Sequence, residues 1–408
     1  MEAGLIGRPS SGGVRYVPSS RSALSGAIES MEYRVPFNRP YMTGRELDLM
    51  AEAYHGLTIS EGGPFTARCE AALKEALGAP AVLLTSSCTH ALEVAALLLD
   101  VGPGDEIIVP SFTFASTANA FAMRGGRPVF ADIRPDTLNI DETLVPGLIT
   151  EKTRGIVVVH YAGVACEMGS VLDTAAAAGV PVVEDNAHGL MGSYRGTPLG
   201  RFGCLATQSF HETKNLTCGK GGALVINDLD YLERAEVLRE KGTNRRQFMD
   251  GLVDKYTWVD LGSSYMPPDV LSAMLLAQIE ARSSIQARRK AIWDRYDAEL
   301  RAWSDSSGVR RPVVPDGCDH PAHLYYLLLP DAACRGRFLE HLRGRGVLSV
   351  FHYVPLHLSP MGRAFGGTPG QCPVTESVSA RLVRLPLFTG MTAEDQGVVI
   401  EAVREFKP

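Results

Sequence analysis

The feature that most constrains the fold of this chain is a series of short, continuous apolar runs that are rich in valine and isoleucine. Runs that do not alternate with polar residues are typical of strands covered on both faces, as in a mostly parallel sheet. Stretches with helical spacing separate these runs, for example residues 89–100 and 168–178. The sequence therefore predicts an α/β fold, with strands at residues 81–85, 106–110, 128–132, 155–160, 181–185, 206–210 and 222–227.

The domain organisation follows from where this pattern begins and ends. Residues 1–30 are rich in Ser, Gly and Arg and lack hydrophobic periodicity, so we expect a flexible extension, with Met31 as a candidate original start. A long helical region over residues 270–301 precedes a segment with its own strand signals at residues 323–329 and 346–352. We expect a large domain over residues 31–285 and a smaller C-terminal α/β domain over residues 286–408.

Charge and composition exclude several classes of protein. The formal net charge of −6 argues against general nucleic-acid binding, because such binding needs a basic surface. No apolar stretch reaches the roughly 20 residues of a membrane span, and the N-terminus has no apolar segment typical of a secretory signal. The eight cysteines are scattered, without a C-x-x-C pair or a Cys/His spacing suited to zinc. We therefore expect a cytoplasmic protein with reduced thiols, no bound metal and no membrane partner.

Several polar groups follow predicted strands, at the sheet edge where open α/β proteins bind ligands. Residues 86–89 (Ser-Ser-Cys-Thr) open a helix whose free N–H groups and dipole favour an anion, although an ordinary N-cap also explains them. Asp185, with His188 three residues later, either faces a ligand cation or caps a loop. Lys214 precedes the glycine-rich residues 219–222 and is either a solvated surface lysine or a Schiff-base lysine in a partly desolvated pocket.

Taken together, these groups match the requirements of pyridoxal 5′-phosphate (PLP). The phosphate needs helix N–H groups, the ring face needs an aromatic side chain such as Phe114, and the aldehyde needs a lysine. The ring nitrogen needs a carboxylate such as Asp185, because a neighbouring anion raises the pKa of the pyridinium. The sequence therefore predicts a PLP site at this edge of the sheet.

Longer motifs extend this interpretation over about residues 36–405. The matching stretches are LLTSSCTHALEVAALLLD, PGDEIIVPSFTFASTANAF, FADIRPDTLNIDETL, VVVHYAGVACEM, VVEDNAHG, SFHETKN, REKGTNRRQF, DKYTW and VFHYVPLH. In these stretches the chain resembles the PLP-dependent nucleotide-sugar aminotransferases of the DegT type, and most closely their dTDP-4-amino-4,6-dideoxygalactose transaminase branch. The resemblance implies a fold-type I, aspartate aminotransferase-like PLP-dependent transferase that acts as a homodimer with composite active sites.

The resemblance also implies roles for individual residues. Lys214 would form the Schiff base and move the proton, and Asp185 would pair with the ring nitrogen. Phe114 would stack on the ring, and His188 would lie near the ring hydroxyl. The residues that would hold the phosphate are Cys88, Thr89 and Ser209. The candidates for the sugar-nucleotide side of the pocket, each equally explained as a packed aromatic or core histidine, are His160, Tyr161, Tyr353 and His357.

Two places depart from the family pattern. Lys220 stands where relatives commonly have Glu in a G-E-G-G sequence, which implies a changed charge near the cofactor loop but no lost chemistry. Ser264 stands where many relatives have an Asn that reaches the phosphate bound by the other subunit, and Met266 stands where Arg is frequent. Ser264 is therefore a candidate for a cofactor contact across the subunit interface.

The expected reaction is transfer of an amino group from L-glutamate to C4 of dTDP-4-keto-6-deoxy-D-glucose, to give a dTDP-4-amino-4,6-dideoxyhexose through pyridoxamine phosphate (PMP). The configuration at C4, gluco or galacto, stays open. One alternative is amination of another nucleotide-linked keto sugar, at a C3 ketone or on a UDP sugar. A PLP-dependent deoxysugar dehydratase is a second, against which Lys214 argues because those relatives have His there. A non-catalytic regulator would need a larger appendage than residues 1–30, and a nicotinamide dehydrogenase would need a G-x-G-x-x-G motif between a strand and a helix.

Overall fold

The computed structural model of this chain describes residues 33–57 and 59–408. The predicted extension at residues 1–30, and with it Met31 as the original start, lies outside the described residues.

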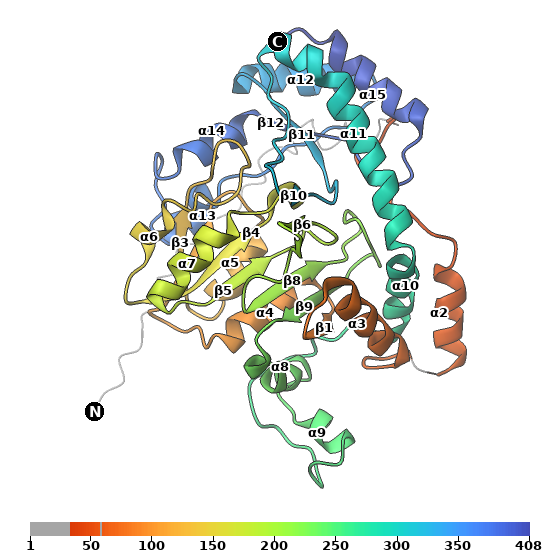
Figure 1. The fold of residues 1–408 in the computed structure, drawn as a ribbon, viewed down its shortest axis with the longest axis vertical. Helices are drawn as coiled ribbons and strands as arrows, with labels where there is room; N and C mark the ends of the chain where they lie inside the picture. The colour runs from red at the N-terminus through yellow and green to blue at the C-terminus, as the bar shows by residue number, and fades with distance from the viewer. Residues whose placement is uncertain (1–32, 58) are drawn as a thin grey trace, which may run out of the picture.

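A seven-stranded sheet forms the centre of the larger part of the chain (Figure 1). Its strand order is β1-β9-β8-β5-β4-β2-β3. Strand β9 runs antiparallel to both of its neighbours, and the other adjacent strands are parallel. The bounds are β1 Ala81–Thr85, β2 Glu106–Pro110, β3 Arg127–Ala131, β4 Thr153–Val159, β5 Val182–Asp185, β8 Leu205–Ser209 and β9 Gly222–Ile226. The predicted strands are therefore confirmed, with no end displaced by more than two residues.

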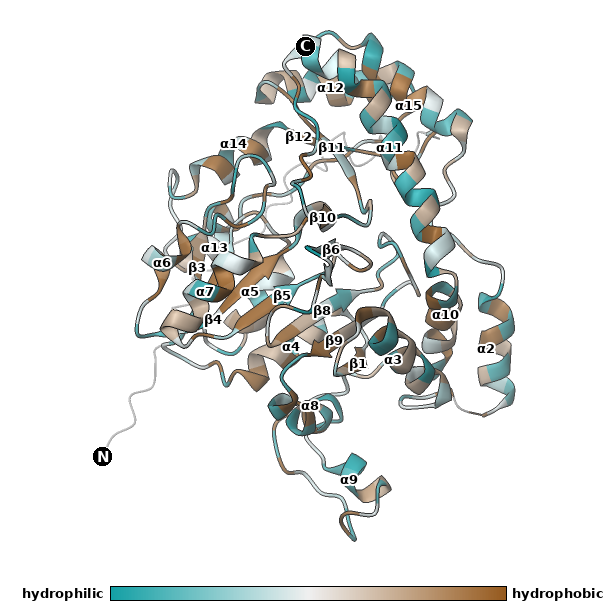
Figure 2. Ribbon diagram, in the orientation of Figure 1, coloured by the Kyte–Doolittle hydropathy of each residue, from teal (hydrophilic) through white to brown (hydrophobic). Residues whose placement is uncertain are grey.

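The strands are mostly apolar because helices cover both faces of the sheet. These helices, with the neighbouring short ones, are α2 Glu46–His55, α3 Pro64–Leu77, α4 Cys88–Leu98, α5 Ala115–Ala122, α6 Val145–Leu148, η1 Tyr161–Gly163, α7 Met168–Ala178, η2 Leu229–Tyr231, α8 Leu232–Arg239 and α9 Arg245–Met249. Ile107 and Val109 of β2 belong to one core cluster with α4 and α5, whereas Ile108 between them belongs to another with α7. Successive side chains of a strand point to opposite faces, so both faces need apolar residues. Figure 2 shows hydrophobic residues concentrated in this sheet and helices of mixed hydropathy around it.

The prediction of one long helix over residues 270–301 is wrong, because the structure has two helices there. They are α10 Asp269–Glu280 and α11 Arg282–Ser307. Ala281, at φ −89° and ψ 3°, leaves helical geometry and lets the chain turn between them. As a result α10 packs beside α2 and α3, while α11 runs on to the C-terminal part of the chain (Figure 1).

The C-terminal residues build a second core around a two-stranded antiparallel sheet. Its elements are β11 Tyr325–Leu328, α12 Ala332–Gly344, η3 Leu356–Leu358, α13 Pro360–Ala364, α14 Pro373–Arg381, β12 Leu382–Leu385 and α15 Ala393–Glu405. Residues 346–352 do not form the predicted strand, since only single bridges form there, from Val347 to Val35 and from Val350 to Arg384. Val35 lies in this second core, although the sequence analysis assigned it to the large domain. The division at residue 285 stays a prediction.

A small three-stranded sheet connects the two parts of the chain. It consists of β6 Ser193–Tyr194, β7 Thr197–Pro198 and β10 Cys318–Asp319, in the order β10-β6-β7. Within residues 33–57 and 59–408, no helix is both long and apolar enough to cross a membrane. The same residues contain no group of three or more His, Cys, Asp or Glu side chains arranged to hold a metal ion.

Candidate active site

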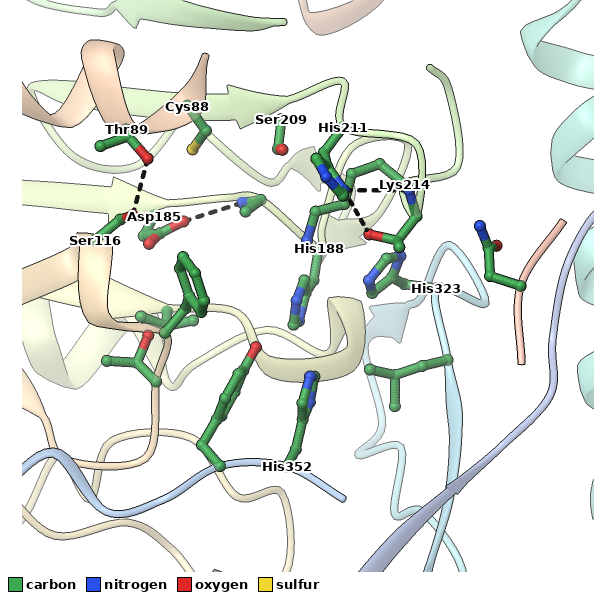
Figure 3. A pocket seen from close by; sticks show the side chains of 18 of the residues that line it. Cys88, Thr89, Ser116, Asp185, His188, Ser209, His211, Lys214, His323 and His352 are labelled. Atoms are coloured by element: carbon green, nitrogen blue, oxygen red, sulfur yellow. Dashed lines mark hydrogen bonds between the residues drawn. The ribbon is translucent and has the colours of Figure 1, made fainter. Parts of the chain in front are cut away.

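A cavity of about 360 Å³ lies at the carboxyl ends of β5 and β8, beside the N-terminus of α4 (Figure 3). Its other wall comes from the C-terminal part of the chain, including Tyr353 and Arg384. The lining contains seven of the eight residues that the sequence analysis assigned to the cofactor: Cys88, Thr89, Phe114, Asp185, His188, Ser209 and Lys214. The fold therefore brings together side chains that are up to 126 positions apart in the sequence, from residue 88 to residue 214.

Lys214 lies in the loop that joins β8 to β9. The loop closes on itself through a hydrogen bond from the Phe210 backbone N–H to the Gly221 carbonyl (2.9 Å). Gly219 has φ +80°, which favours glycine and explains part of the glycine-rich sequence after the lysine. Burial lowers the pKa of the Lys214 ammonium to about 8, and the nearby Arg384 cation acts in the same direction. More of this amine is therefore neutral and nucleophilic at physiological pH than in a surface lysine.

Asp185 ends β5 as a buried carboxylate that has two hydrogen-bond donors. Its Oδ2 accepts from the Thr117 hydroxyl (2.7 Å), and its Oδ1 accepts from the Ala187 N–H (3.2 Å). Burial raises the pKa of Asp185, while these two hydrogen bonds and the Lys214 charge oppose the rise. A nearby cation stabilises the ionised form of a desolvated carboxylate, and a protonated ring nitrogen would be such a cation.

The N-terminus of α4 forms the anion-binding side of the cavity. The Ser87 hydroxyl caps the helix by accepting from the His90 N–H (3.1 Å), and the earlier first-turn N–H groups have no intrahelical acceptor. Thr89 Oγ1 contacts Ser116 Oγ at 2.8 Å (Figure 3), which ties α4 to α5. Gly222 of β9 makes this approach possible, because a Cβ there would lie 2.3 Å from the Cys88 nitrogen.

Cys88 itself presents a neutral group to the cavity. Burial raises the pKa of the Cys88 thiol above its ordinary value, so the side chain keeps its proton. The thiol donates to the Thr207 hydroxyl at 3.4 Å. A neutral thiol at the helix terminus avoids charge repulsion with a phosphate.

Four histidines line the cavity, His188, His211, His323 and His352 (Figure 3), and the first and third of them stack on each other. His188 stacks on His323, with ring centroids 4.3 Å apart, and accepts a hydrogen bond at Nδ1 from the Ala162 N–H (3.3 Å). His323 Nδ1 lies 2.9 Å from Asn215 Oδ1, an acceptor that requires the proton on Nδ1. Burial lowers the pKa of both rings well below the ordinary value for histidine, so both are neutral. Neutral rings can surround the Lys214 amine without adding positive charge.

Four predicted residues do not reach the cavity of their own chain. His160 is fully buried and lies 2.9 Å from Glu184, and Tyr161 is buried in the core. His357 is also fully buried, with Nδ1 2.6 Å from the Ser111 hydroxyl. For these three, the alternative of a packed aromatic or core histidine describes the structure, whereas Tyr353 does line the cavity. Ser264 is exposed and outside the cavity lining, so its contact across an interface stays a prediction.

The sequence analysis missed several lining residues. They are Phe37, Asn38, Thr113, Ser116, His211, His323, His352 and Arg384. His352 stands inside the quoted VFHYVPLH stretch, but nothing distinguished it from its neighbours. Arg384 lies in an apolar run, RLVRLPLF, and had no motif to mark it. Only the approach of the C-terminal part to the sheet brings these two side chains to Lys214.

Comparison with known proteins identifies the family. A model of the DegT/DnrJ/EryC1/StrS aminotransferase family matches residues 40–404. The chain belongs to this family. The predicted α/β, fold-type I class and the predicted aminotransferase activity are therefore confirmed.

The relatives include a curated protein named for polysaccharide biosynthesis and several solved structures. SpsC, a spore coat polysaccharide biosynthesis protein of Bacillus subtilis strain 168, is 30% identical over 386 residues, which cover 93% of this chain and 98% of SpsC. The crystal structure of the aminotransferase TlmJ from Streptoalloteichus hindustanus superposes with a TM-score of 0.82 at 32% identity, covering 92% of this chain and 97% of TlmJ. Spr1654 of Streptococcus pneumoniae, named as a candidate sugar aminotransferase, gives a TM-score of 0.84 at 26% identity in its PMP form, covering 91% of this chain and 98% of Spr1654.

PLP is the cofactor of this family, and Spr1654 has been solved in both PLP and PMP forms. The side chains of this chain fit the cofactor. The cavity volume is within the range of small-molecule sites, and it is lined by a buried amine, a buried carboxylate and a helix N-terminus. The predicted cofactor is therefore confirmed, while the role of each side chain stays a proposal.

Proposed function

We propose that this enzyme transfers an amino group from L-glutamate to C4 of dTDP-4-keto-6-deoxy-D-glucose, to give a dTDP-4-amino-4,6-dideoxyhexose. The observation that carries the proposal is a single cavity that holds the Lys214 amine, the Asp185 carboxylate and the N-terminus of α4. A sugar as acceptor is supported by two relatives, one named for polysaccharide biosynthesis and one named as a candidate sugar aminotransferase. The nucleotide and the position of the ketone rest on the sequence resemblance.

PLP would supply an electron sink and a carrier for the amino group. Lys214 would bind it covalently through Nζ and then move a proton between the reacting carbon and its own amine, for which a pKa near neutrality is suited. Asp185 would hold the ring nitrogen in its charged form, with Thr117 fixing the carboxylate. Ser209 and the first turn of α4, with Cys88 and Thr89, would hold the phosphate.

The remaining predicted contacts are assigned by their place in the cavity. Phe114, with 62% of its surface exposed, is free to cover the ring face. His188, a neutral ring with a free Nε2–H, would donate to the ring hydroxyl. Tyr353 would contact the sugar nucleotide. A different nucleotide-linked keto sugar, with a C3 ketone or a UDP group, is the alternative acceptor.

We also propose a homodimer with composite active sites. The segment after α9 projects from the body of the subunit (Figure 1) and exposes large apolar side chains. Leu252 and Trp258 keep 74% and 75% of their surface exposed. Exposing large apolar side chains to water is unfavourable in a monomer, and a partner surface would cover them. A second subunit covering this segment could bring Ser264 to a neighbouring cavity. A cytoplasmic location is supported by the eight cysteines, all of which are free thiols.

The test is incubation of the PLP-loaded enzyme with dTDP-4-keto-6-deoxyglucose and L-glutamate, with NMR of the product. A 4-amino sugar supports the proposal, and the coupling constants at C4 give its configuration. An unchanged ketone beside an aminated UDP-keto sugar or 3-keto sugar would favour the alternative acceptor, and loss of a hydroxyl without gain of nitrogen would favour a dehydratase.

Two variants test the residues. Lys214→Ala should lose the absorbance of the covalently held cofactor and fall in turnover by orders of magnitude, yet still bind PMP non-covalently. Asp185→Asn should keep the covalent bond to the cofactor and lose most of the rate, because a neutral ring is a weaker electron sink. A Lys214→Ala enzyme with the wild-type spectrum would mean that another lysine holds the cofactor.

A further inference from the structure

Arg289, in the first half of α11, is a buried cation that none of the proposed roles uses. Only 2% of its surface is exposed, and burial alone lowers the pKa of its guanidinium to about 9. In the part of the chain that the structure describes, no carboxylate pairs with it, whereas two other cations of α11 pair with acidic side chains four positions further on. Burying an unpaired guanidinium reduces the free energy of unfolding, so the contacts that it makes there must offset that cost.

The guanidinium donates to backbone carbonyls instead. Its Nη2 donates to the His323 carbonyl at 2.6 Å, and its Nε donates to the Ala322 carbonyl at 3.3 Å. A longer bond joins Nη2 to the Leu387 carbonyl at 3.5 Å. His323 and Leu387 both line the cavity, so one side chain of α11 holds two parts of its second wall.

The segment that Arg289 holds contains a strained turn. Ala322 is fully buried and has φ +49°, in the left-handed region that favours glycine. A residue keeps such a conformation only where its surroundings hold it there. The Ala322 N–H donates to His320 Nδ1 at 3.2 Å, and the Ala322 carbonyl accepts from Arg289. Side chains therefore fix the backbone on both sides of the strained residue.

The same turn presents His323 to the loop that carries Lys214 (Figure 3). The His323 Nδ1 lies 2.9 Å from the Asn215 Oδ1, and the Asn215 Nδ2 donates to the Pro321 carbonyl at 2.7 Å. Asn215 directly follows Lys214 and is itself buried. One side-chain amide therefore connects the lysine loop to the two residues that flank the strained one, where the guanidinium holds the turn.

We propose that Arg289 is a positioning residue, whose bonds to the turn hold Asn215 and so fix the place of the Lys214 amine in the cavity. This inference rests on the proposed function, since it takes Lys214 as the residue that binds the cofactor. Arg289 does not line the cavity, so it acts through backbone carbonyls and one amide side chain. Loss of the guanidinium should free the lysine loop without removing any side chain that lines the cavity.

A set of variants tests the proposal. Arg289→Met removes the guanidinium, and Arg288→Met is the matched control, because it removes an adjacent, exposed arginine of α11. Asn215→Ala removes the link to the lysine loop. Ala322→Gly replaces the strained residue by one that adopts a positive φ readily. The first readout is hydrogen exchange of residues 210–221 in the cofactor-free protein. The second is the rate at which the protein captures PLP, followed by the absorbance of the covalently held cofactor.

Arg289→Met should speed exchange in this loop roughly tenfold and slow the capture of PLP by a similar factor, because the amine loses its position and part of its burial. Arg288→Met should match the wild type in both readouts. Arg289→Lys keeps the charge without the planar geometry that reaches both carbonyls, so it should show a smaller loss and provides the test if the methionine variant folds poorly.

Two double variants distinguish positioning from a general loss of stability. Because Arg289 and Asn215 act through the same turn, Arg289→Met should add little to the effect of Asn215→Ala. Adding Ala322→Gly to Arg289→Met should recover part of the loss, since glycine does not need the guanidinium to hold its conformation. Loss of a merely structural contact would give additive effects and no such recovery.

The outcomes separate this inference from the proposed function. Loop exchange or PLP capture that stays within twofold of the wild type in both Arg289 variants overturns the inference and leaves transamination intact. Effects of Arg289→Met and Asn215→Ala that add fully also overturn it, because the two side chains would then act independently. Failure of the wild type to aminate any keto sugar contradicts the proposed function, while exchange and PLP capture still decide whether Arg289 positions the lysine.

Discussion

The buried amine of Lys214 predicts an unusual result for the stability of the cofactor-free protein. Burial lowers the pKa of its ammonium from 10.5 to about 8. Keeping the charged form buried therefore reduces the free energy of unfolding. Replacing Lys214 with methionine removes the charge and leaves a side chain of similar length. We therefore expect Lys214→Met to be more stable than the wild type at pH 7, although it removes the amine that we propose binds the cofactor.

The size of the gain follows from the pKa difference. A shift from 10.5 to about 8 corresponds to roughly 3 kcal/mol at 1.36 kcal/mol per pH unit. Below pH 8 both the folded and the unfolded state bind the proton, so the full penalty applies to the wild type. Between pH 8 and 10.5 the unfolded state binds more protons than the folded state, and the stability of the wild type rises with pH. At pH 9.5 the advantage of the variant should shrink to roughly 1–2 kcal/mol.

Urea unfolding of both cofactor-free proteins at pH 7 and pH 9.5 measures this difference. The control is Lys220→Met, which removes a charge from an exposed position at the same cavity and should change stability by less than about 0.5 kcal/mol. A Lys214→Met protein that is no more stable than the wild type at pH 7 would refute the reasoning. So would an advantage that does not diminish at pH 9.5.

Thr117→Val removes a hydrogen bond to the Asp185 carboxylate, so turnover should fall roughly tenfold while Thr117→Ser stays close to the wild type; steady-state kinetics with equal cofactor loading decide this. Glu184→Gln should lower the free energy of unfolding by about 2–4 kcal/mol, because the Glu184 carboxylate accepts hydrogen bonds from three backbone N–H groups and contacts His160. An unchanged midpoint of urea unfolding would contradict that account. Light scattering should give a dimer at micromolar concentration, with an interface well over roughly 1,600 Å², and a fully active monomer would exclude the composite site. Starting the chain at Met31 should leave activity and melting temperature nearly unchanged, and a large loss of either would mean that residues 1–30 pack on the enzyme.

The central sheet and the cofactor side of the cavity were predictable because short, contiguous sequence patterns indicate them. Continuous apolar runs identified the strands of the large sheet, and Asp185 and Ser209 stand at strand ends, where parallel sheets present their ligand-binding groups. Lys214 was marked by its place between a buried strand and a glycine-rich turn. In each case a few consecutive residues carried both the structural signal and the chemical group.

Burial was harder to predict than position. His160 and Tyr161 follow β4 and therefore stand at the same sheet edge as Asp185, yet both are buried in the core rather than facing the cavity. Glu184 pairs with the His160 ring, and that partner comes from the neighbouring strand β5. The sequence shows the type of residue at a strand end but not which neighbour covers it.

The sequence by itself thus determined the strands and the presence of Lys214 and Asp185 at the ligand-binding edge of the sheet, because periodicity and short motifs encode them. Only the tertiary structure decided the second wall of the cavity. His323, His352 and Arg384 lie more than 100 residues after Lys214, and nothing in their local sequence marks these three side chains as cavity residues. They reach the cavity because the C-terminal part of the chain, which follows α11, forms its second wall (Figure 1). Contacts of this kind depend on how the two cores pack against each other, and no local sequence pattern in either core predicts that packing.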